Sequence, residues 1–306
     1  MEVAIETRAL VKRFGDRAAV DGVDLVVPQG VAFGFLGPNG AGKTTLIRTL
    51  LGLTAPSSGE VVLLGLPQPQ KRREALARVG AIVEEPRFHP HLTGRENLKI
   101  IAAARERAAD ARIPDALARV GLTARADDRV KTYSLGMRQR LGIARCLLAD
   151  PALLILDEPL NGLDPAGILE MRRLIRAFCD EGRTVFLSSH LLDEVEKVCD
   201  HVAIVDQGRV ILQGAVDEVA ATGQPTVLLG VDDPAATRTL LAAEPRVTHV
   251  ELEGSELRLT LAGDLTSADV NQLLVAGGVR VSRLEPARAT LEEKFLAVTS
   301  RLEGND

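Results

Sequence analysis

The chain has 306 residues, of which 46% are hydrophobic and 26% charged, which is typical of a folded protein with room for two domains of about 100–200 residues. Its 37 Lys and Arg against 42 Asp and Glu give a net charge of −5, which argues against direct nucleic-acid binding. We find no apolar run of ~18 residues and no basic N-terminal leader, so we expect a cytoplasmic chain. The three cysteines, Cys146, Cys179 and Cys199, lack metal-ligand spacing and predict reduced, buried thiols.

The first predicted elements are strands. Residues 5–10 and 20–27 alternate apolar and polar side chains around the turn residues Gly15 and Asp16. A third short apolar run, residues 31–36, is long enough for a buried strand and is followed at once by a glycine-rich stretch and a helix-like sequence. Strand, glycine-rich loop and helix in this order predict a phosphate site.

The glycine-rich stretch "GPNGAGKTT" matches the pattern G-x-x-x-x-G-K-[ST]. Its glycines let the backbone approach phosphate oxygens, so that N–H groups and the positive helix end point at the anion. Lys43 would reach the β- and γ-phosphates, Thr44 would bind Mg²⁺, and Thr45 would assist near the α-phosphate. A plain glycine turn is the alternative. The predicted nucleotide-binding residues here are Gly37, Pro38, Asn39, Gly40, Ala41, Gly42, Lys43, Thr44 and Thr45.

Two adjacent acids, Asp157 and Glu158, follow the apolar run at residues 152–156. Ligands gather at the carboxyl ends of parallel strands, so this pair would arrive beside the phosphates. Side chains at a strand end point in different directions, so we predict that Asp157 holds Mg²⁺ and that Glu158 is the general base that polarises water. A solvated acidic strand end is the alternative. The run at residues 184–188 leads to His190, which we predict to contact the γ-phosphate or orient the water rather than to be a packed histidine.

Five stretches resemble the ATP-binding subunits of ATP-binding cassette (ABC) transporters. They are "GPNGAGKT", "YSLGM" with "RQRLGIARCLL", "LLILDEP", "NGLDP" and "SSHLLDEVEKVCDHVAIVDQGRVI", and they span residues 1–214 in the order and spacing of that family. The resemblance implies an α/β fold: a RecA-like P-loop NTPase core, an N-terminal antiparallel β subdomain and an inserted helical subdomain at about residues 86–150. Independently, the Ala-, Leu- and Arg-rich composition of residues 93–150 predicts helices. The resemblance also implies ATP and Mg²⁺ as cofactors.

The resemblance assigns further residues to the site. Phe14 falls where the family stacks an aromatic ring on adenine. Ser134 and Gly136, at the start of a helical run, would bind the γ-phosphate of ATP held by the other copy, and Asp164 of "NGLDP" would join the nucleotide site.

Two positions depart from the family pattern. Glu84 stands where glutamine is common in the loop that senses the γ-phosphate and faces the membrane partner. A carboxylate can approach Mg²⁺ but cannot donate a hydrogen bond as an amide does, so we predict a metal contact for Glu84. Leu135 stands where the signature usually has glycine, and we leave it out of the phosphate contacts.

The last ninety residues change character after Gly223 and Pro225, which mark a predicted linker at residues 215–225. Their order of strand, helix, two strands, helix and strand predicts a small ferredoxin-like α+β domain over residues 226–306. The predicted elements are residues 226–231, 234–243, 247–252, 257–261, 267–276 and 279–284, with a closing helix at 290–298. The sequence contains no catalytic pattern here, and we expect dimerisation or regulation. The stretch "EPARATLEEKF" resembles C-terminal extensions in exporters of antibiotics and lantibiotics.

These features together predict an energy-coupling ATPase. The resemblance implies that two copies, or one copy and a similar subunit, sandwich two ATP molecules and drive a separate permease, most consistently an exporter of drugs, antibiotics or peptides. The chain would then lie at the cytoplasmic face of the cell membrane. One rival is an ATPase of the same superfamily that acts on ribosomes or DNA, which the single P-loop and the lack of sustained heptads disfavour. An inert nucleotide binder is another.

Overall fold

A six-stranded sheet lies at the centre of residues 1–216, one of the two compact units into which the chain divides. The computed structural model describes residues 2–105, 108–221, 225–263, 265–287 and 291. All neighbouring strands of the sheet are parallel except the pair of β9 and β10. In spatial order the strands are β10 (Arg209–Ala215), β9 (His201–Asp206), β3 (Ala32–Leu36), β8 (Thr184–Ser189), β7 (Leu153–Leu156) and β6 (Val79–Ile82).

Strands β3, β7 and β8 are buried along their whole length, as expected of parallel strands covered on both faces. Stacked phenylalanines join two of them: the ring centroid of Phe186 lies 5.9 Å from that of Phe33 and 5.8 Å from that of Phe35. Offset aromatic pairs of this kind stabilise a core beyond the area they bury. The strand that leads into the glycine-rich loop is thereby held firmly beside β8.

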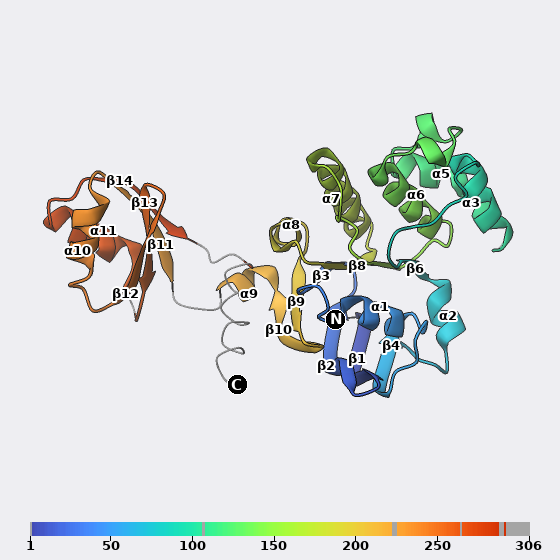
Figure 1. The fold of residues 1–306 in the computed structure, drawn as a ribbon, viewed down its shortest axis with the longest axis horizontal. Coiled ribbons are helices and arrows are strands. Elements are labelled where there is room, and N and C mark those ends of the chain that lie inside the picture. The colour runs from blue at the N-terminus through green and yellow to red at the C-terminus, as the bar shows by residue number, and fades with distance from the viewer. Residues whose placement is uncertain (1, 106–107, 222–224, 264, 288–290, 292–306) are drawn as a thin grey trace. The chain divides into compact units, whose positions relative to one another are not determined.

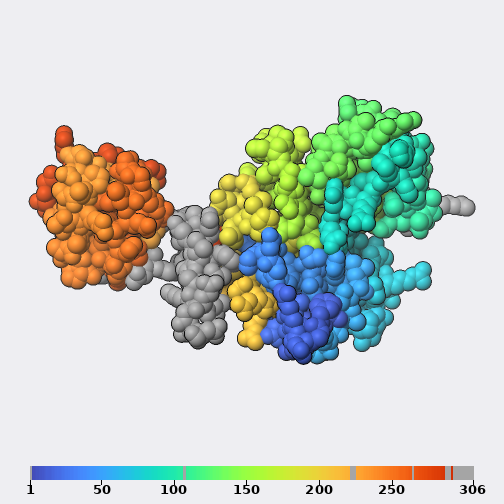
Figure 2. Space-filling model, in the orientation of Figure 1, coloured from blue at the N-terminus to red at the C-terminus, as the bar shows by residue number. Residues whose placement is uncertain are grey.

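Helices and a second sheet cover the central sheet (Figure 1). Helix α1 (Lys43–Leu50) lies on one face, and α7 (Pro165–Asp180) lies on the other. The second sheet is antiparallel and lies on the side of α1; Figure 2 shows it, in blue, as part of one continuous body with the green helices. Its strands, in spatial order, are β2 (Arg17–Pro28), β1 (Val3–Phe14), β4 (Ser58–Leu63) and β5 (Leu66–Pro67).

A helical segment connects β6 to β7. Two of its helices begin at side-chain caps: Thr93 forms a capping box with Glu96 before α3, and Ser134 caps α6. Beyond β7, Asp164 caps α7 in the same way. The helical elements of this segment are α3 (Gly94–Ala103), α4 (Ala108–Ala111), α5 (Ile113–Arg119), η1 (Thr123–Arg125), η2 (Val130–Thr132) and α6 (Leu135–Leu147). The remaining helices of the first unit are α2 (Arg72–Ala77) and α8 (Leu192–Glu196). Helix α9 (Val216–Ala221) begins at the last residue of this unit.

Residues 217–306 form the second unit, in which a four-stranded antiparallel sheet packs against two helices. The spatial order of the strands is β12-β13-β11-β14. The outer strand β12 lies beside β13, to which a turn joins it, whereas the outer strand β14 lies beside β11, the first strand of the unit. The elements are β11 (Thr226–Val231), α10 (Pro234–Leu241), β12 (Val247–Glu253), β13 (Glu256–Leu261), α11 (Ser267–Ala276) and β14 (Val281–Ala287). The predicted order of these elements is therefore confirmed.

The structure corrects some predicted boundaries. The predicted linker at residues 215–225 is not wholly irregular, because Val216–Ala221 form α9. Helix α10 ends at Leu241, two residues before its predicted end, and β14 begins at Val281, two residues after its predicted start. The predicted closing helix at residues 290–298 lies outside the described residues except for Leu291, which is buried. The three cysteines are free and buried, as predicted.

Candidate nucleotide site

The glycine-rich loop joins β3 to α1, and two of its glycines have no room for a side chain. At Gly37 an added Cβ would lie 2.3 Å from the carbonyl oxygen of Val205. At Gly42, with φ at +102°, an added Cβ would lie 2.1 Å from the carbonyl oxygen of Ala19. The loop backbone therefore packs directly on neighbouring backbone, which fixes its path, and only glycine fits at these two positions.

Lysine 43 opens α1, and its side chain is only 6% exposed. Its Nζ donates to the carbonyl oxygens of Gly37 and Pro38, at 2.7 and 3.2 Å, and lies 3.1 Å from Oε1 of Glu158. The first backbone N–H groups of α1 have no partner within the helix and point along its axis, where the helix dipole is positive. A buried ammonium and a helix N-terminus therefore converge on one loop, which is the arrangement that binds phosphate.

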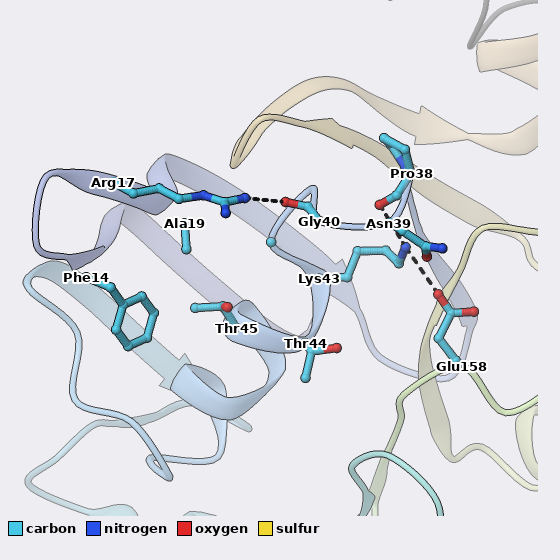
Figure 3. Close-up of a pocket in the computed structure, with 11 residues that line it drawn as sticks. Phe14, Arg17, Ala19, Pro38, Asn39, Gly40, Lys43, Thr44, Thr45 and Glu158 are labelled. Atoms are coloured by element: carbon cyan, nitrogen blue, oxygen red, sulfur yellow. Dashed lines mark hydrogen bonds and ion pairs between the residues drawn. The ribbon is translucent and has the colours of Figure 1, made fainter.

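The loop borders a cavity of about 430 Å³ that is open to solvent (Figure 3). Phe14, which is 55% exposed, and Thr45 lie at one end of it, and Lys43 and Glu158 point toward one another at the other. Ligand pockets typically enclose roughly 300–1,000 Å³, so the volume suits a small molecule. The lining residues are Phe14, Arg17, Ala19, Pro38, Asn39, Gly40, Gly42, Lys43, Thr44, Thr45 and Glu158. Of the predicted loop residues, Gly37 and Ala41 support the loop without lining this cavity.

The two predicted acids lie at the end of β7 and differ in exposure. Asp157 is 4% exposed and accepts a 2.6 Å hydrogen bond from Oγ of Ser188. Glu158 turns away, with φ at +48°, and its Oε2 lies 2.9 Å from Nδ1 of His190. The structure thus brings Glu158, His190 and Lys43 together, as the strand-end argument predicts. Asp157 and His190 lie next to the cavity without lining it.

Three other predicted site residues lie apart from the cavity, at helix starts. Ser134 is exposed at the start of α6, where its Oγ accepts from the Met137 N–H at 3.2 Å, and Gly136 follows in the first turn. Asp164 accepts from the N–H of Gly167 at 2.8 Å as the cap of α7.

Glu84, with φ at +61°, is 59% exposed and forms an ion pair with Arg48 of α1. It does not line the cavity that Thr44 lines, so its contact with Mg²⁺ stays a prediction. Leu135 is half-buried, and an added Cβ at Gly162 would lie 2.9 Å from its Cδ2. Leu135 therefore packs toward the loop before α7, which accounts for a large residue at a position predicted to be small.

Three residues at the site, Arg17, Ala19 and Ser188, were not predicted from the sequence. Arg17 lines the cavity, and its Nη2 donates to the carbonyl oxygen of Gly40 at 3.2 Å. Ser188 lies between the two acids. Arg17 stands in a polar turn with no motif around it, and Ser188 reads as one more residue of a buried strand, so neither carries a sequence signal.

Comparison with known proteins identifies the family. A family model described as "ABC transporter" matches residues 20–161. The bacitracin transport ATP-binding protein BcrA of Bacillus licheniformis is 39% identical over 301 residues, which cover 97% of this chain and 97% of the relative. The chain belongs to the ABC transporter ATP-binding family.

Other members of the ABC family agree. The Nod factor export ATP-binding protein I of Rhizobium meliloti (strain 1021) is 36% identical over 306 residues, 98% of this chain and 89% of the relative. The structure of cbiO1 from Clostridium perfringens, part of the ABC transporter complex cbiONQ, matches with a TM-score of 0.67 and 28% identity over 80% of this chain and 97% of that chain. The chain is therefore an ATP-binding ATPase subunit of an ABC transporter, with the ABC ATPase fold.

The residues of the cavity fit ATP. The glycine loop, the Lys43 ammonium and the helix N-terminus suit the phosphates, and the exposed Phe14 ring offers a stacking surface for the base. The hydroxyl of Thr44 in the cavity lining, and the carboxylate of Asp157, which is buried at the end of β7 outside the lining, are oxygen donors of the kind that Mg²⁺ prefers. Among the described helices, none is long and apolar enough to cross a membrane.

Proposed function

We propose that this chain is the energy-coupling subunit of an exporter of antibiotics, drugs or peptides, bound to a separate permease at the cytoplasmic face of the membrane. The names of two relatives, bacitracin transport and Nod factor export ATP-binding proteins, support an exporter. The folding of the C-terminal residues into an antiparallel sheet and two helices supports a ferredoxin-like module, to which we assign a dimerisation or regulatory role.

In the proposed hydrolysis of ATP each side chain of the site has a separate role. Glu158 is the general base, and His190, 2.9 Å from its Oε2, orients the carboxylate and the water. Lys43 and the loop amides would bind the phosphates, and the hydroxyl of Thr44 with the carboxylate of Asp157 would hold Mg²⁺. The ion would neutralise phosphate charge when bound. Phe14 stacks on the base.

One observation carries the proposal that two copies act together. Ser134 and Gly136 do not line the cavity that Lys43 and Thr44 line, and Ser134 is exposed. An added Cβ at Gly136 would meet nothing closer than Leu163 Cδ2 at 3.6 Å, so packing within the chain does not require glycine there. The absence of a side chain at Gly136 leaves room for a group from outside the chain. We propose that this group is the γ-phosphate of ATP held by a second copy or by a similar subunit.

A mixing experiment tests this pairing. Ser134→Arg damages one half of a composite site and Lys43→Ala the other, so each variant alone should lack ATP-driven pairing and turnover. A mixed pair of the two variants contains one composite site with both halves intact. We therefore expect equimolar mixing to restore part of the pairing, measured by light scattering with ATP, and part of the turnover. If mixing restores neither, the two halves do not come from different copies.

The permease is proposed to dock beside the Glu84 loop. A groove of about 530 Å³ follows β6 toward this loop and combines apolar residues with arginines. Leu53 at the groove is 63% exposed, which is unusual for leucine. In cells that produce the protein, Leu53→Asp should lower the fraction that sediments with membranes, whereas Leu252→Asp, at a leucine 54% exposed on the second unit, should not. Equal fractions for both variants would contradict this docking site.

A further inference from the structure

A buried hydroxyl joins the two acids of the site. Ser188 is fully buried at the end of β8, and its Oγ donates to Oδ1 of Asp157 at 2.6 Å and accepts from the backbone N–H of Glu158 at 2.9 Å. A hydroxyl has one proton to donate and two lone pairs that accept, so one side chain serves both acids at once. The bond to Asp157 is short and is made to a carboxylate, which is the stronger kind, whereas the bond from the Glu158 N–H has the ordinary length.

The bond to Glu158 lies at a strained turn. Glu158 has φ at +48°, in the left-handed region that side chains other than glycine rarely adopt. This turn separates the two acids: Asp157 stays buried beside β8, whereas Glu158 reaches Lys43 and His190. A strained backbone persists only where its surroundings hold it, and the Ser188 bond is such a restraint.

Ser188 also marks the place where ordinary strand pairing stops. The parallel ladder between β7 and β8 ends with the pair of Leu156 and Leu187, and the next residue of β8 contributes its side chain instead. The backbone of Ser188 still pairs with Phe35 on β3, the strand that leads into the phosphate loop. The hydroxyl therefore ties the acids to the strand that sets the position of the phosphate loop.

We propose that Ser188 is a positioning residue that sets the relative places of Asp157 and Glu158. This inference rests on the proposed roles of the two acids. It predicts that removal of the hydroxyl lowers kcat more than it weakens ATP binding, because Lys43 and Phe14 would bind ATP without it. Loss of a hydrogen bond to a charged group corresponds to roughly a 10- to 100-fold lower kcat.

The test compares two substitutions of equal size. Ser188→Thr keeps the hydroxyl and Ser188→Val lacks it, and both add the same bulk, so their difference isolates the hydroxyl. We expect Ser188→Thr to turn over ATP about tenfold or more faster than Ser188→Val, with a smaller difference in KM for ATP than in kcat. Thr184→Val is the matched control, since Thr184 is a buried hydroxyl on the same strand that accepts from Gly30 and does not contact either acid.

A second measurement needs no nucleotide. Hydrogen exchange of the Glu158 amide should be about tenfold faster in Ser188→Val than in Ser188→Thr or Thr184→Val, because its acceptor is gone. Equal exchange and equal turnover in the Thr and Val variants of Ser188 would overturn the inference. The outcome for the proposed function is separate: if Glu158→Gln itself turns over ATP normally, the role of Glu158 fails whatever Ser188 does.

Discussion

The Nζ of Lys43 lies 3.1 Å from Oε1 of Glu158, so the proposed phosphate-binding cation and the proposed base form an ion pair at one end of the cavity (Figure 3). The same carboxylate reaches His190 through its second oxygen, at 2.9 Å. Lys43, Glu158 and His190 therefore have partners within the protein, so a phosphate that binds Lys43 must compete with the Glu158 carboxylate. A substitution of Lys43 or of Glu158 is therefore expected to affect the other side chain of the pair.

Replacement of Glu158, the proposed base, should separate ATP binding from ATP hydrolysis. Glu158→Gln removes the carboxylate that accepts a proton and also the ion-pair partner of Lys43, so kcat should fall by about 10²–10⁴-fold while ATP binding is kept or strengthened. Turnover and ATP binding by calorimetry on the same preparations measure both. Glu74→Gln, an exposed glutamate of α2, is the control and should match the unsubstituted chain. Normal turnover of Glu158→Gln would assign the base to another residue.

Two glycines should respond in opposite ways to the same substitution. Gly42→Ala places a Cβ 2.1 Å from the carbonyl of Ala19 at φ +102°, so the loop must distort and both stability and ATP binding should fall. Gly136→Ala meets no obstacle in the chain and replaces a helical glycine, which should raise stability by about 0.5–1 kcal/mol. Its ATP-driven pairing should nevertheless weaken. Thermal unfolding and light scattering distinguish the two, and intact pairing in Gly136→Ala would remove Gly136 from the proposed contact.

Phe14 should contribute to ATP affinity and little to folding, because its ring is 55% exposed. Its contact with Lys12, whose Nζ lies 4.9 Å from the ring centroid, is worth only about 0.5–1 kcal/mol at an exposed site. Base stacking on an aromatic side chain is worth about 1–3 kcal/mol, so Phe14→Ala should weaken ATP binding by roughly 5- to 150-fold. Phe14→Tyr should bind normally, since it keeps the ring. Because stacking accepts any base, GTP should lose the same factor; an ATP affinity unchanged in Phe14→Ala would place the base elsewhere.

Local sequence patterns predicted much of this molecule, for a physical reason. The path from β3 through the glycine loop to α1 and the run that ends in Asp157 depend on side chains that are neighbours in the chain. The same holds for the caps: Ser134 was recognised as a helix start because a hydroxyl there bonds the N–H three residues on.

Contacts between distant segments were not predictable in this way. The bond from Ser188 to Asp157 joins residues 31 apart and exists only because β7 and β8 pair in one particular register. Glu84 was predicted from a family position, but its pairing with Arg48 depends on where α1 lies in space. Leu135 was identified as a departure, and only the packed structure reveals that it faces the loop that contains Gly162.

The last prediction concerns stability at high pH. Burial raises the pKa of the Cys146 thiol from 9.0 to about 11, with small opposing effects of Arg145 and Arg105. Between about pH 9 and 11 the unfolded chain loses this proton while the folded chain keeps it, so the free energy of unfolding falls with rising pH, by about 2–3 kcal/mol in total. Below pH 9 the thiol is neutral in both states and contributes no slope.

Cys146→Ala isolates this effect. The variant loses packing in the first unit and should be less stable at every pH, but it has no thiol to ionise. The stability gap between the unsubstituted chain and the variant should therefore narrow as pH rises from about 9 to 11, in urea unfolding followed for the transition of residues 1–216. The lysines, Tyr133 and the other two cysteines are present in both chains, so their titration cancels in the difference. A gap that stays constant across this range would mean that Cys146 is ionised as easily in the folded chain as in the unfolded one, which its burial at 3% exposure argues against.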